Sequence, residues 1–454
     1  MRTLIKNGDV VCAARQRRLD VLVEDAHIAS VAPHIEAADA TVIDAAGCLV
    51  FPGFIDTHTH FDLDFGNTVT ADNFITGTRA ALVGGTTTIL DFATQNRGRT
   101  MGEALAAWHE KARGSSCNYG FHMAMSEWSE ALYNEMPAMM GAGVTSFKMY
   151  MVYPHLFVDD GALYRAQKRA AQLSALIGVH CENYALLQAL TQEQKVLGNP
   201  GPAAHPRSRP PIVEAEAVSR CLRVCELAGA AAYIVHLSTG EGLAEARRAR
   251  LRGQTVLLET CPQYLLLVDA CYDDPDGAKY VMSPPLRTKD DTQKLWQGLV
   301  DGDIQTVGTD HCSFTMEQKR LGLRDFTLIP NGAAGVETRP ALYYTYGVKT
   351  GALPPCAMAA HLSENAARIF GMYPQKGAIL PGSDADIVVW EPVYRNTISY
   401  RNLRHNCDNT PFEGFETAGR ARDVLLGGVW AVQAGKLTRE GCGRFVPRGI
   451  RQDV

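Results

Sequence analysis

The middle of the chain alternates short apolar runs with longer helical stretches, and this alternation constrains the fold more than any other feature. Eight runs have the length and composition of buried strands: Gly53–Asp56, Thr86–Asp91, Tyr119–Ala124, Val144–Tyr150, Ala175–His180, Ala231–His236, Thr255–Thr260 and Ile304–Thr309. Helical stretches lie between them, for example Glu103–Ala112, Leu163–Gln172, Glu214–Leu227 and Gly242–Arg250. Strands that alternate with helices in this way predict an α/β fold, a (β/α)8 TIM barrel.

Both ends of the chain have a different character, because they consist of short strand-like runs and turns. Leu19–Val23 alternates polar and apolar residues, as a half-buried strand does. Late in the chain, Asp386–Trp390 is a predicted strand and Asp423–Trp430 resembles a hairpin. We therefore predict a small β-sandwich domain built from both termini. The predicted boundaries are 1–52 for its first part, 53–372 for the barrel, 373–437 for its second part and 438–454 for a C-terminal tail.

The composition excludes several partner classes. The 454 residues include 44 Lys and Arg against 49 Asp and Glu, for a formal net charge of −5, so we expect no nucleic-acid partner. No apolar run approaches the ~20 residues that span a bilayer, so we expect no membrane partner. The 12 Cys are scattered without a Cys-x-x-Cys pair, which is typical of reduced thiols and predicts a cytoplasmic protein.

Polar residues stand at the ends of several predicted strands, where barrels carry their active sites. His58 and His60 are two residues apart, so on extended backbone both imidazoles face the same side. Further candidates at strand ends are Lys148, His180, His236 and Asp310. Each residue alone has an ordinary structural explanation, but together they predict a metal site. Four His and one Asp exceed what one tetrahedral ion needs, which indicates two divalent ions, with Zn the best match, ~3.5–4 Å apart.

Lys148 needs a separate explanation, because two neighbouring cations require a bridging anion and an ammonium group has no acceptor. Beside two cations the amine is expected to lose its proton readily. A neutral amine can add carbon dioxide to form a carbamate, which behaves as a bidentate carboxylate. We therefore predict that Lys148 is modified to N6-carboxylysine.

Nine segments in this order resemble the amidohydrolase superfamily and, within it, the dihydropyrimidinase/hydantoinase family. They are FPGFIDTHTHFD, GGTTTILDF, SFKMYMVY, HCENY, IVHLSTG, ETCPQYL, MSPPLR, GTDHC and NGAAGVETR. The later segments PQKGAILPGSDADIVVW and FEGFETAG look similar to the bacterial D-hydantoinase and phenylhydantoinase branch. The resemblance covers nearly the whole chain.

The resemblance implies a role for each candidate residue. One metal is held by His58, His60 and Asp310, and the more exposed metal by His180 and His236, with carboxylated Lys148 and a hydroxide between them. The oxyanion-stabilising tyrosine falls on Tyr153, and backbone groups at Ser283 and Asn331 meet the substrate ring. Relatives are commonly homotetramers, so a homotetramer is expected here.

Two loops depart from the family pattern or suggest specificity. Tyr153 is followed by Pro154-His155, where many relatives have a lysine, so the loop that gates the substrate is expected to differ in shape. Leu63, Phe65 and Phe157 either form an apolar wall for a substituent on the substrate ring or simply pack the loops. His311 follows Asp310 and should point away from it, so we assign it a structural role.

The predicted activity is opening of cyclic ureides, either 5-monosubstituted hydantoins or dihydropyrimidines, to N-carbamoyl amino acids. In this hypothesis a metal-bound hydroxide attacks the ring amide, Tyr153 stabilises the oxyanion, and Asp310 transfers the proton to the leaving nitrogen. Three alternatives stay open. Dihydroorotases typically carry an Arg where this chain has Asp62, allantoinases typically show a Pro-Gly motif in the same loop, and non-catalytic scaffold relatives lose metal ligands that are present here.

Overall fold

Eight parallel strands form the central sheet of the computed structural model, which describes residues 2–66 and 68–453. They are β8 (Phe54–Thr59), β9 (Thr86–Gln95), β10 (Asn118–Met125), β11 (Ser146–Tyr150), β12 (Leu176–His180), β13 (Ala232–Ile234), β14 (Val256–Thr260) and β15 (Thr306–Val307). Each strand pairs in parallel with the next along the chain. A parallel bridge between Thr59 and His311 joins the first strand to the segment after the eighth and closes the barrel.

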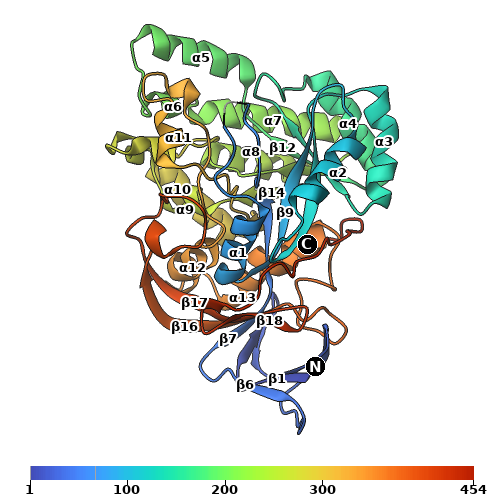
Figure 1. Cartoon of the computed structure of the whole chain (residues 1–454). Helices are drawn as coiled ribbons and strands as arrows, with labels where there is room; N and C mark the ends of the chain where they lie inside the picture. The colour runs from blue at the N-terminus through green and yellow to red at the C-terminus, as the bar shows by residue number, and fades with distance from the viewer. Residues whose placement is uncertain (1, 67, 454) are drawn as a thin grey trace.

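Helices cover the outside of this barrel (Figure 1). They are α1 (Phe74–Gly84), α2 (Met101–Lys111), α3 (Glu130–Gly141), α4 (Asp160–Leu173), α5 (Tyr184–Val196), α6 (Ala204–Arg207), α7 (Pro211–Ala228), α8 (Gly240–Leu251), α9 (Pro262–Leu266), α10 (Lys289–Val300), α11 (Met316–Arg320), α12 (Arg339–Tyr343), α13 (Pro355–Ala359) and α14 (Asn365–Ile369). Short helical turns are η1 (Asp269–Asp273), η2 (Gly277–Tyr280), η3 (Phe326–Leu328), η4 (Tyr344–Val348), η5 (Ala360–Glu364) and η6 (Tyr400–Asn402). Among the described residues, none of these helices has the length and apolar character to cross a membrane.

The local sequence explains these elements. Every residue of β8, β11, β12 and β14 is buried, as expected for parallel strands covered on both faces. The first barrel helix, α1, is capped at its start by Asn73, whose side chain accepts a hydrogen bond from the Thr76 N–H at 2.9 Å. It ends at Gly85, whose φ of +94° suits glycine.

Two further sheets are built from the chain ends. The four-stranded sheet contains β5 (His27–Ala32), β4 (Asp20–Glu24), β1 (Arg2–Lys6) and β6 (Thr41–Asp44). The seven-stranded sheet contains β19 (Lys436–Leu437), β18 (Val429–Gln433), β17 (Glu416–Leu426), β16 (Ile387–Thr397), β7 (Leu49–Pro52), β2 (Asp9–Val11) and β3 (Gln16–Arg18). Ile5, Val21, Ile387 and Leu425 share one buried core between the sheets. The predicted fold class, a TIM barrel with a small domain from both termini, is confirmed.

The last described residues do not extend away from the protein but lie along the barrel. Phe445 bridges to Tyr119 of β10 in parallel, and the buried Arg448 donates a hydrogen bond to Ser146 Oγ at 2.7 Å. The segment predicted as a tail therefore packs against the start of the barrel strands.

Candidate metal and active site

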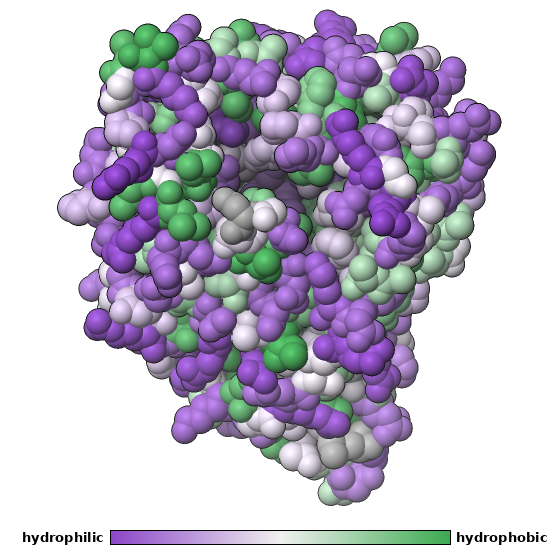
Figure 2. Space-filling view, turned by 45° about the horizontal axis from the view of Figure 1, so that its top comes forward, coloured by the Kyte–Doolittle hydropathy of each residue, from purple (hydrophilic) through white to green (hydrophobic). Residues whose placement is uncertain are grey.

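The six predicted metal ligands lie together at one end of the barrel. Strand β7 ends at Pro52 and β8 begins at Phe54, so the barrel strands start beside the terminal sheets and their carboxyl ends lie at the opposite end. Figure 2 turns this end forward and shows a hollow in the upper half of the molecule. A cavity of about 460 Å³ is lined by His58, His60, Lys148, His180, His236 and Asp310. Side chains in or just after five different strands therefore line one space.

Asp310 is the meeting point of the first two histidines. Its Oδ1 lies 3.1 Å from Nε2 of His60 and 3.2 Å from Nε2 of His58. Burial raises the pKa of Asp310, but the imidazoles of His58, His60 and His236 outweigh it and hold that pKa well below its usual value. The Asp310 carboxylate is therefore ionised at neutral pH. A φ of +52° at Asp310 and of +39° at His236 shows that the backbone is held in an uncommon conformation to aim these side chains.

The imidazoles have nitrogen atoms free for a cation. Nε2 of His58 and Nδ1 of His236 are buried and form no hydrogen bond within the described residues. One ligand atom each from His58, His236 and Asp310 lies within 4.8 Å of the others, which is close enough for a shared ion. Burial also lowers the pKa of His60, His180 and His236, so these rings are neutral and can act as ligands. The donor set thus fits divalent metal ions. The close group combines His58 and Asp310, which are predicted to bind one metal, with His236, which is predicted to bind the other.

Lys148 is buried in β11 without a carboxylate partner. Its side chain forms no ion pair or hydrogen bond within the described residues, and Nζ lies 5.0 Å from the Phe92 ring centroid and 5.2 Å from that of Tyr150. Burial lowers the pKa of Lys148 to about 8, against the opposing effects of Asp310 and Glu259. An amine in this environment loses its proton far more readily than an exposed lysine does.

Two buried carboxylates behind the histidines were not predicted from the sequence. Glu259, at the end of β14, lies 2.6 Å from Nδ1 of His58 and accepts a hydrogen bond from the Tyr233 hydroxyl at 2.7 Å. Glu182 lies 2.8 Å from Nε2 of His180 and accepts a hydrogen bond from Arg209 at 2.5 Å. Each carboxylate fixes one ring nitrogen as a donor, so the other nitrogen is left as an acceptor. A charged residue at the buried end of the seventh run was the signal that could have identified Glu259.

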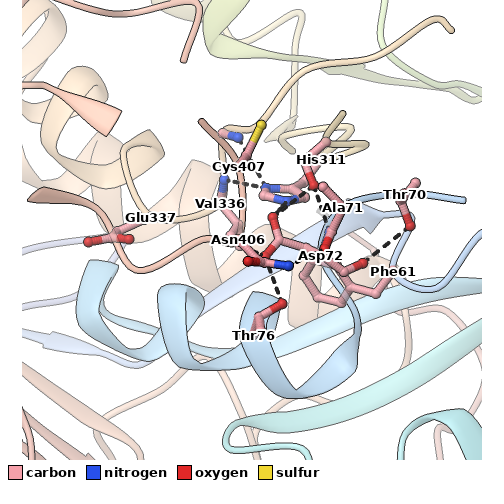
Figure 3. A network of polar contacts seen from close by, with 12 residues as sticks. Phe61, Thr70, Ala71, Asp72, Thr76, His311, Val336, Glu337, Asn406 and Cys407 are labelled. Carbon is pink, nitrogen blue, oxygen red and sulfur yellow. Dashed lines mark hydrogen bonds and ion pairs between the residues drawn. The ribbon is translucent and has the colours of Figure 1, made fainter. Parts of the chain in front are cut away.

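His311 points away from the cavity, as the sequence indicates. Its Nε2 lies 3.0 Å from Oδ2 of Asp72, and its Nδ1 accepts hydrogen bonds from the N–H groups of Gly335 and Val336 at 3.1 and 3.2 Å (Figure 3). Asp72 also accepts a hydrogen bond from the Asn406 N–H at 2.7 Å. Burial raises the pKa of Asp72, but His311, the Asn406 N–H and His405 together outweigh it and lower that pKa below its ordinary value. This network anchors the residue next to Asp310 from outside the cavity.

The predicted substrate-binding residues line the same cavity with one exception. Tyr153, Ser283, Asn331, Leu63 and Phe65 all lie on its wall. The Oδ1 of Asn331 forms no hydrogen bond within the described residues and is free for a ligand, whereas the Ser283 side chain interacts with the Tyr153 hydroxyl. Burial raises the pKa of Tyr153, whose hydroxyl therefore stays protonated.

Phe157, the third residue predicted for the apolar wall, lies elsewhere. Its ring is 5.2 Å from that of Tyr184, and it is absent from the residues that line the cavity. Its main chain bridges to Tyr150, and its ring lies against Tyr184 of α5. Asp62 is likewise absent from the cavity wall: its carboxylate accepts a hydrogen bond from the Phe74 N–H at 3.1 Å, at the start of α1.

Comparison with known proteins finds similar proteins over nearly the full length of the chain. Residues 49–431 match the model of the amidohydrolase family. The chain is 42% identical to a D-hydantoinase of Geobacillus stearothermophilus, over 99% of this chain and 97% of the relative. It is 44% identical to a D-hydantoinase of Streptomyces coelicolor, over 99% of both chains. The crystal structure of a dihydropyrimidinase from Brevibacillus agri NCHU1002 superposes with a TM-score of 0.98, at 42% identity and full coverage of both chains.

Proposed function

This chain belongs to the amidohydrolase family, and from this premise we propose that it opens 5-monosubstituted hydantoins, dihydropyrimidines or both to N-carbamoyl amino acids. The similarity to D-hydantoinases and to a dihydropyrimidinase over the whole chain supports a hydrolase of cyclic amides. The observation that carries the proposal is the convergence of His58, His60, Lys148, His180, His236 and Asp310 on one cavity.

The proposed cofactor is a pair of divalent ions, most simply Zn. His58, His60 and Asp310 would hold one ion, His180 and His236 the other, and carboxylated Lys148 would lie between them. Nε2 of His58 and Nδ1 of His236 form no hydrogen bond within the described residues, and the Lys148 amine has no carboxylate partner among them, which supports this assignment. When bound, the ions would lower the pKa of a water toward ~7 and polarise the ring carbonyl.

The chain's own residues would carry out the remaining chemistry. The Asp310 carboxylate, which is ionised at neutral pH, would accept the proton of the attacking water and return it to the leaving ring nitrogen. The Tyr153 hydroxyl would donate a hydrogen bond to the oxygen of the carbonyl under attack. Backbone groups at Ser283 and Asn331 would orient the ring through its amides, and the place of both residues on the cavity wall supports this role.

The cavity wall favours a ureide with an apolar substituent. Leu63 and Phe65 line the cavity, so a side group on carbon 5 of the ring would pack against them. This supports 5-substituted hydantoins, including aromatic ones, and the names of the relatives support the D enantiomer. Dihydropyrimidines present the same cyclic ureide and stay within the proposal.

The alternatives fit less well. A dihydroorotase needs a cation for the substrate carboxylate, but no arginine is among the described residues that line the cavity. Asp62, at the position where that arginine is expected, binds the start of α1 instead of facing the cavity. A non-catalytic scaffold would have no need of the six intact ligand positions.

We propose further that the protein is a cytoplasmic homotetramer. The 12 cysteines are all unpaired, which is typical of a reducing compartment. The tetramer is an expectation from the family, and light scattering on the purified protein would test it.

A substrate panel tests the proposed function most directly. Zinc-loaded protein is assayed with dihydrouracil, allantoin, dihydroorotate and both enantiomers of 5-phenylhydantoin, and the N-carbamoyl product is identified by mass spectrometry. We expect turnover of D-phenylhydantoin, of dihydrouracil or of both, and little of allantoin or dihydroorotate. Preferential turnover of either of the last two compounds, or no turnover at all, would contradict the proposal.

A further inference from the structure

A buried lysine outside the metal centre contacts the walls of the substrate cavity. Lys319 lies in α11 with a relative exposure of 1%. Its Nζ donates hydrogen bonds to three main-chain oxygens: Val281 at 2.8 Å, Pro330 at 2.7 Å and Gly332 at 2.7 Å. No carboxylate pairs with this amine among the described residues, so the carbonyl groups are its binding partners.

The three acceptors flank both residues proposed to hold the substrate ring. Val281 stands two residues before Ser283, and Pro330 and Gly332 stand on either side of Asn331. The N–H of Gly332 also donates to the oxygen of Val281 at 3.0 Å. The two ring-binding segments are therefore joined to each other and to the same amine.

The number of acceptors indicates the form of the amine. A neutral amine has two hydrogens to donate, whereas an ammonium group has three, and three acceptors are present. Burial lowers the pKa of Lys319 to about 7, and the neighbouring Cys312 and Cys407 act against this. A buried charge that is satisfied by main-chain oxygens fixes the positions of those oxygens closely.

The apolar part of the cavity is connected to the same residue. Nζ of Lys319 lies 5.4 Å from the ring centroid of Phe314, and the Phe314 ring lies 5.1 Å from that of Phe65. Phe65 belongs to the wall proposed to contact the ring substituent. Lys319 thus contacts the segments that carry the proposed polar contacts with the substrate, and Phe314 connects it to the proposed apolar contact. None of its described contacts is with a proposed metal ligand.

We propose that Lys319 is a positioning residue that holds Ser283, Asn331 and Phe65 in the arrangement that recognises the cyclic ureide. This inference rests on the proposed function and deepens it, because it assigns substrate affinity to a residue that does not touch the substrate. Loss of the amine would loosen the two ring-binding segments but leave the metal ligands on their strands. The effect should therefore appear in substrate affinity more than in metal content.

The test compares Lys319→Met, which keeps the length of the side chain without its donors, with Lys319→Gln, which keeps two donors. A matched control is Arg250→Met. Arg250 also binds main-chain oxygens, those of Val256 and Asp303, both at 2.7 Å, but its acceptors lie at the start of β14 and in the turn before β15. Each holoenzyme is measured for kcat and KM with D-phenylhydantoin, for metal content, for thermal stability, and for binding of dihydrouracil and hydantoin by calorimetry.

We expect Lys319→Met to raise KM at least tenfold, with kcat changed less and metal content unchanged. Lys319→Gln should lie between Lys319→Met and the parent enzyme, whereas Arg250→Met should lose thermal stability without a change in KM. An unchanged KM in a folded Lys319 variant, or equal changes in KM for Lys319→Met and Arg250→Met, would overturn the inference. Failure of both Lys319 variants to fold would also overturn it, because the residue would then serve the fold as a whole.

The same experiment separates this inference from the proposed function. A parent enzyme that hydrolyses ureides while Lys319→Met keeps its KM refutes the inference alone. A parent enzyme that binds a ureide in the calorimeter without hydrolysing it, and loses binding in Lys319→Met, refutes hydrolysis but supports the positioning role. A parent enzyme that neither binds nor hydrolyses any ureide refutes both.

Discussion

Nδ1 of His58 lies 2.6 Å from Oε1 of Glu259, although 201 residues separate them in the chain. Burial raises the pKa of Glu259, but His58, Thr57 and Tyr233 together outweigh it and lower that pKa, so the carboxylate is charged and accepts a hydrogen bond from Nδ1–H. Nε2 of His58 is thereby left as a free acceptor on the cavity side. The seventh strand contributes no proposed ligand, but it sets the tautomer of the first one.

Glu259→Gln tests this relationship. The amide is uncharged and attracts the Nδ1–H group of His58 less strongly than the carboxylate does. We therefore expect metal affinity to fall by about 10- to 100-fold. Metal content after dialysis against a graded chelator series measures the change. Asp20→Asn serves as the control, since Asp20 is also buried but accepts its hydrogen bonds from Asn7 and Ile35 in the terminal sheets. Equal metal retention in the two variants would show that Glu259 does not act on the metal site.

Lys148→Ala tests the proposed carbamate. Without an anion between the ions, the variant should bind much less metal than the parent enzyme and should be inactive. Short carboxylic acids such as acetate or propionate should restore part of both, because they can occupy the space of the missing carbamate. Metal analysis and activity are measured with and without the acid, and the parent enzyme receives the same additions. A variant with full metal content and no response to acid contradicts the bridging role.

Asp310→Asn tests the proton transfer. The amide cannot accept a proton, so kcat should fall by roughly 10³-fold or more, in the upper range of what general acid–base catalysis contributes. Metal content is determined on the same preparation, because Asp310 is also a proposed ligand. The control is Asp64→Asn, which changes another carboxylate on the cavity wall that accepts a hydrogen bond from the Gly66 N–H at 2.7 Å. Near-normal turnover of metal-replete Asp310→Asn would exclude the role.

Tyr153→Phe tests stabilisation of the oxyanion. Removing one preorganised donor should lower kcat by about 10²- to 10³-fold and change KM little. Steady-state kinetics of Tyr150→Phe gives the comparison, since Tyr150 lines the same cavity but has no proposed contact with the substrate carbonyl. If both variants lose the same activity, the effect is one of packing and not of catalysis.

Phe65→Ala tests the apolar wall. Burying an aromatic side chain contributes about 1.5–3 kcal/mol, and Phe65 is 41% exposed, so we use the lower part of that range. We expect kcat/KM for phenylhydantoin to fall about tenfold relative to unsubstituted hydantoin. Phe157→Ala should leave this ratio unchanged, because Phe157 packs against Tyr184. A shift in the ratio for Phe157→Ala alone would reverse the assignment of the wall.

The predictable part of the site follows from local patterns. The strand-like runs and their polar ends place His58, Lys148, His180 and Asp310 at the carboxyl ends of parallel strands, and a closed barrel brings these ends together. The partners of these residues are less predictable. Glu182 is two residues from His180, yet its contact with Arg209 depends on a loop 27 residues further along the chain.

The sequence by itself determined the barrel, the terminal sheets and the end of the barrel at which the ligands meet, because strand period and parallel order fix which side chains share an edge. Only the tertiary structure decided that Glu259 supports His58, that Phe157 turns toward Tyr184, and that Lys319 joins the segments of Ser283 and Asn331. These contacts connect residues that are distant in the chain or lie in irregular loops. No local periodicity encodes them, and they form only when the packed barrel excludes water and each buried polar group must find a partner.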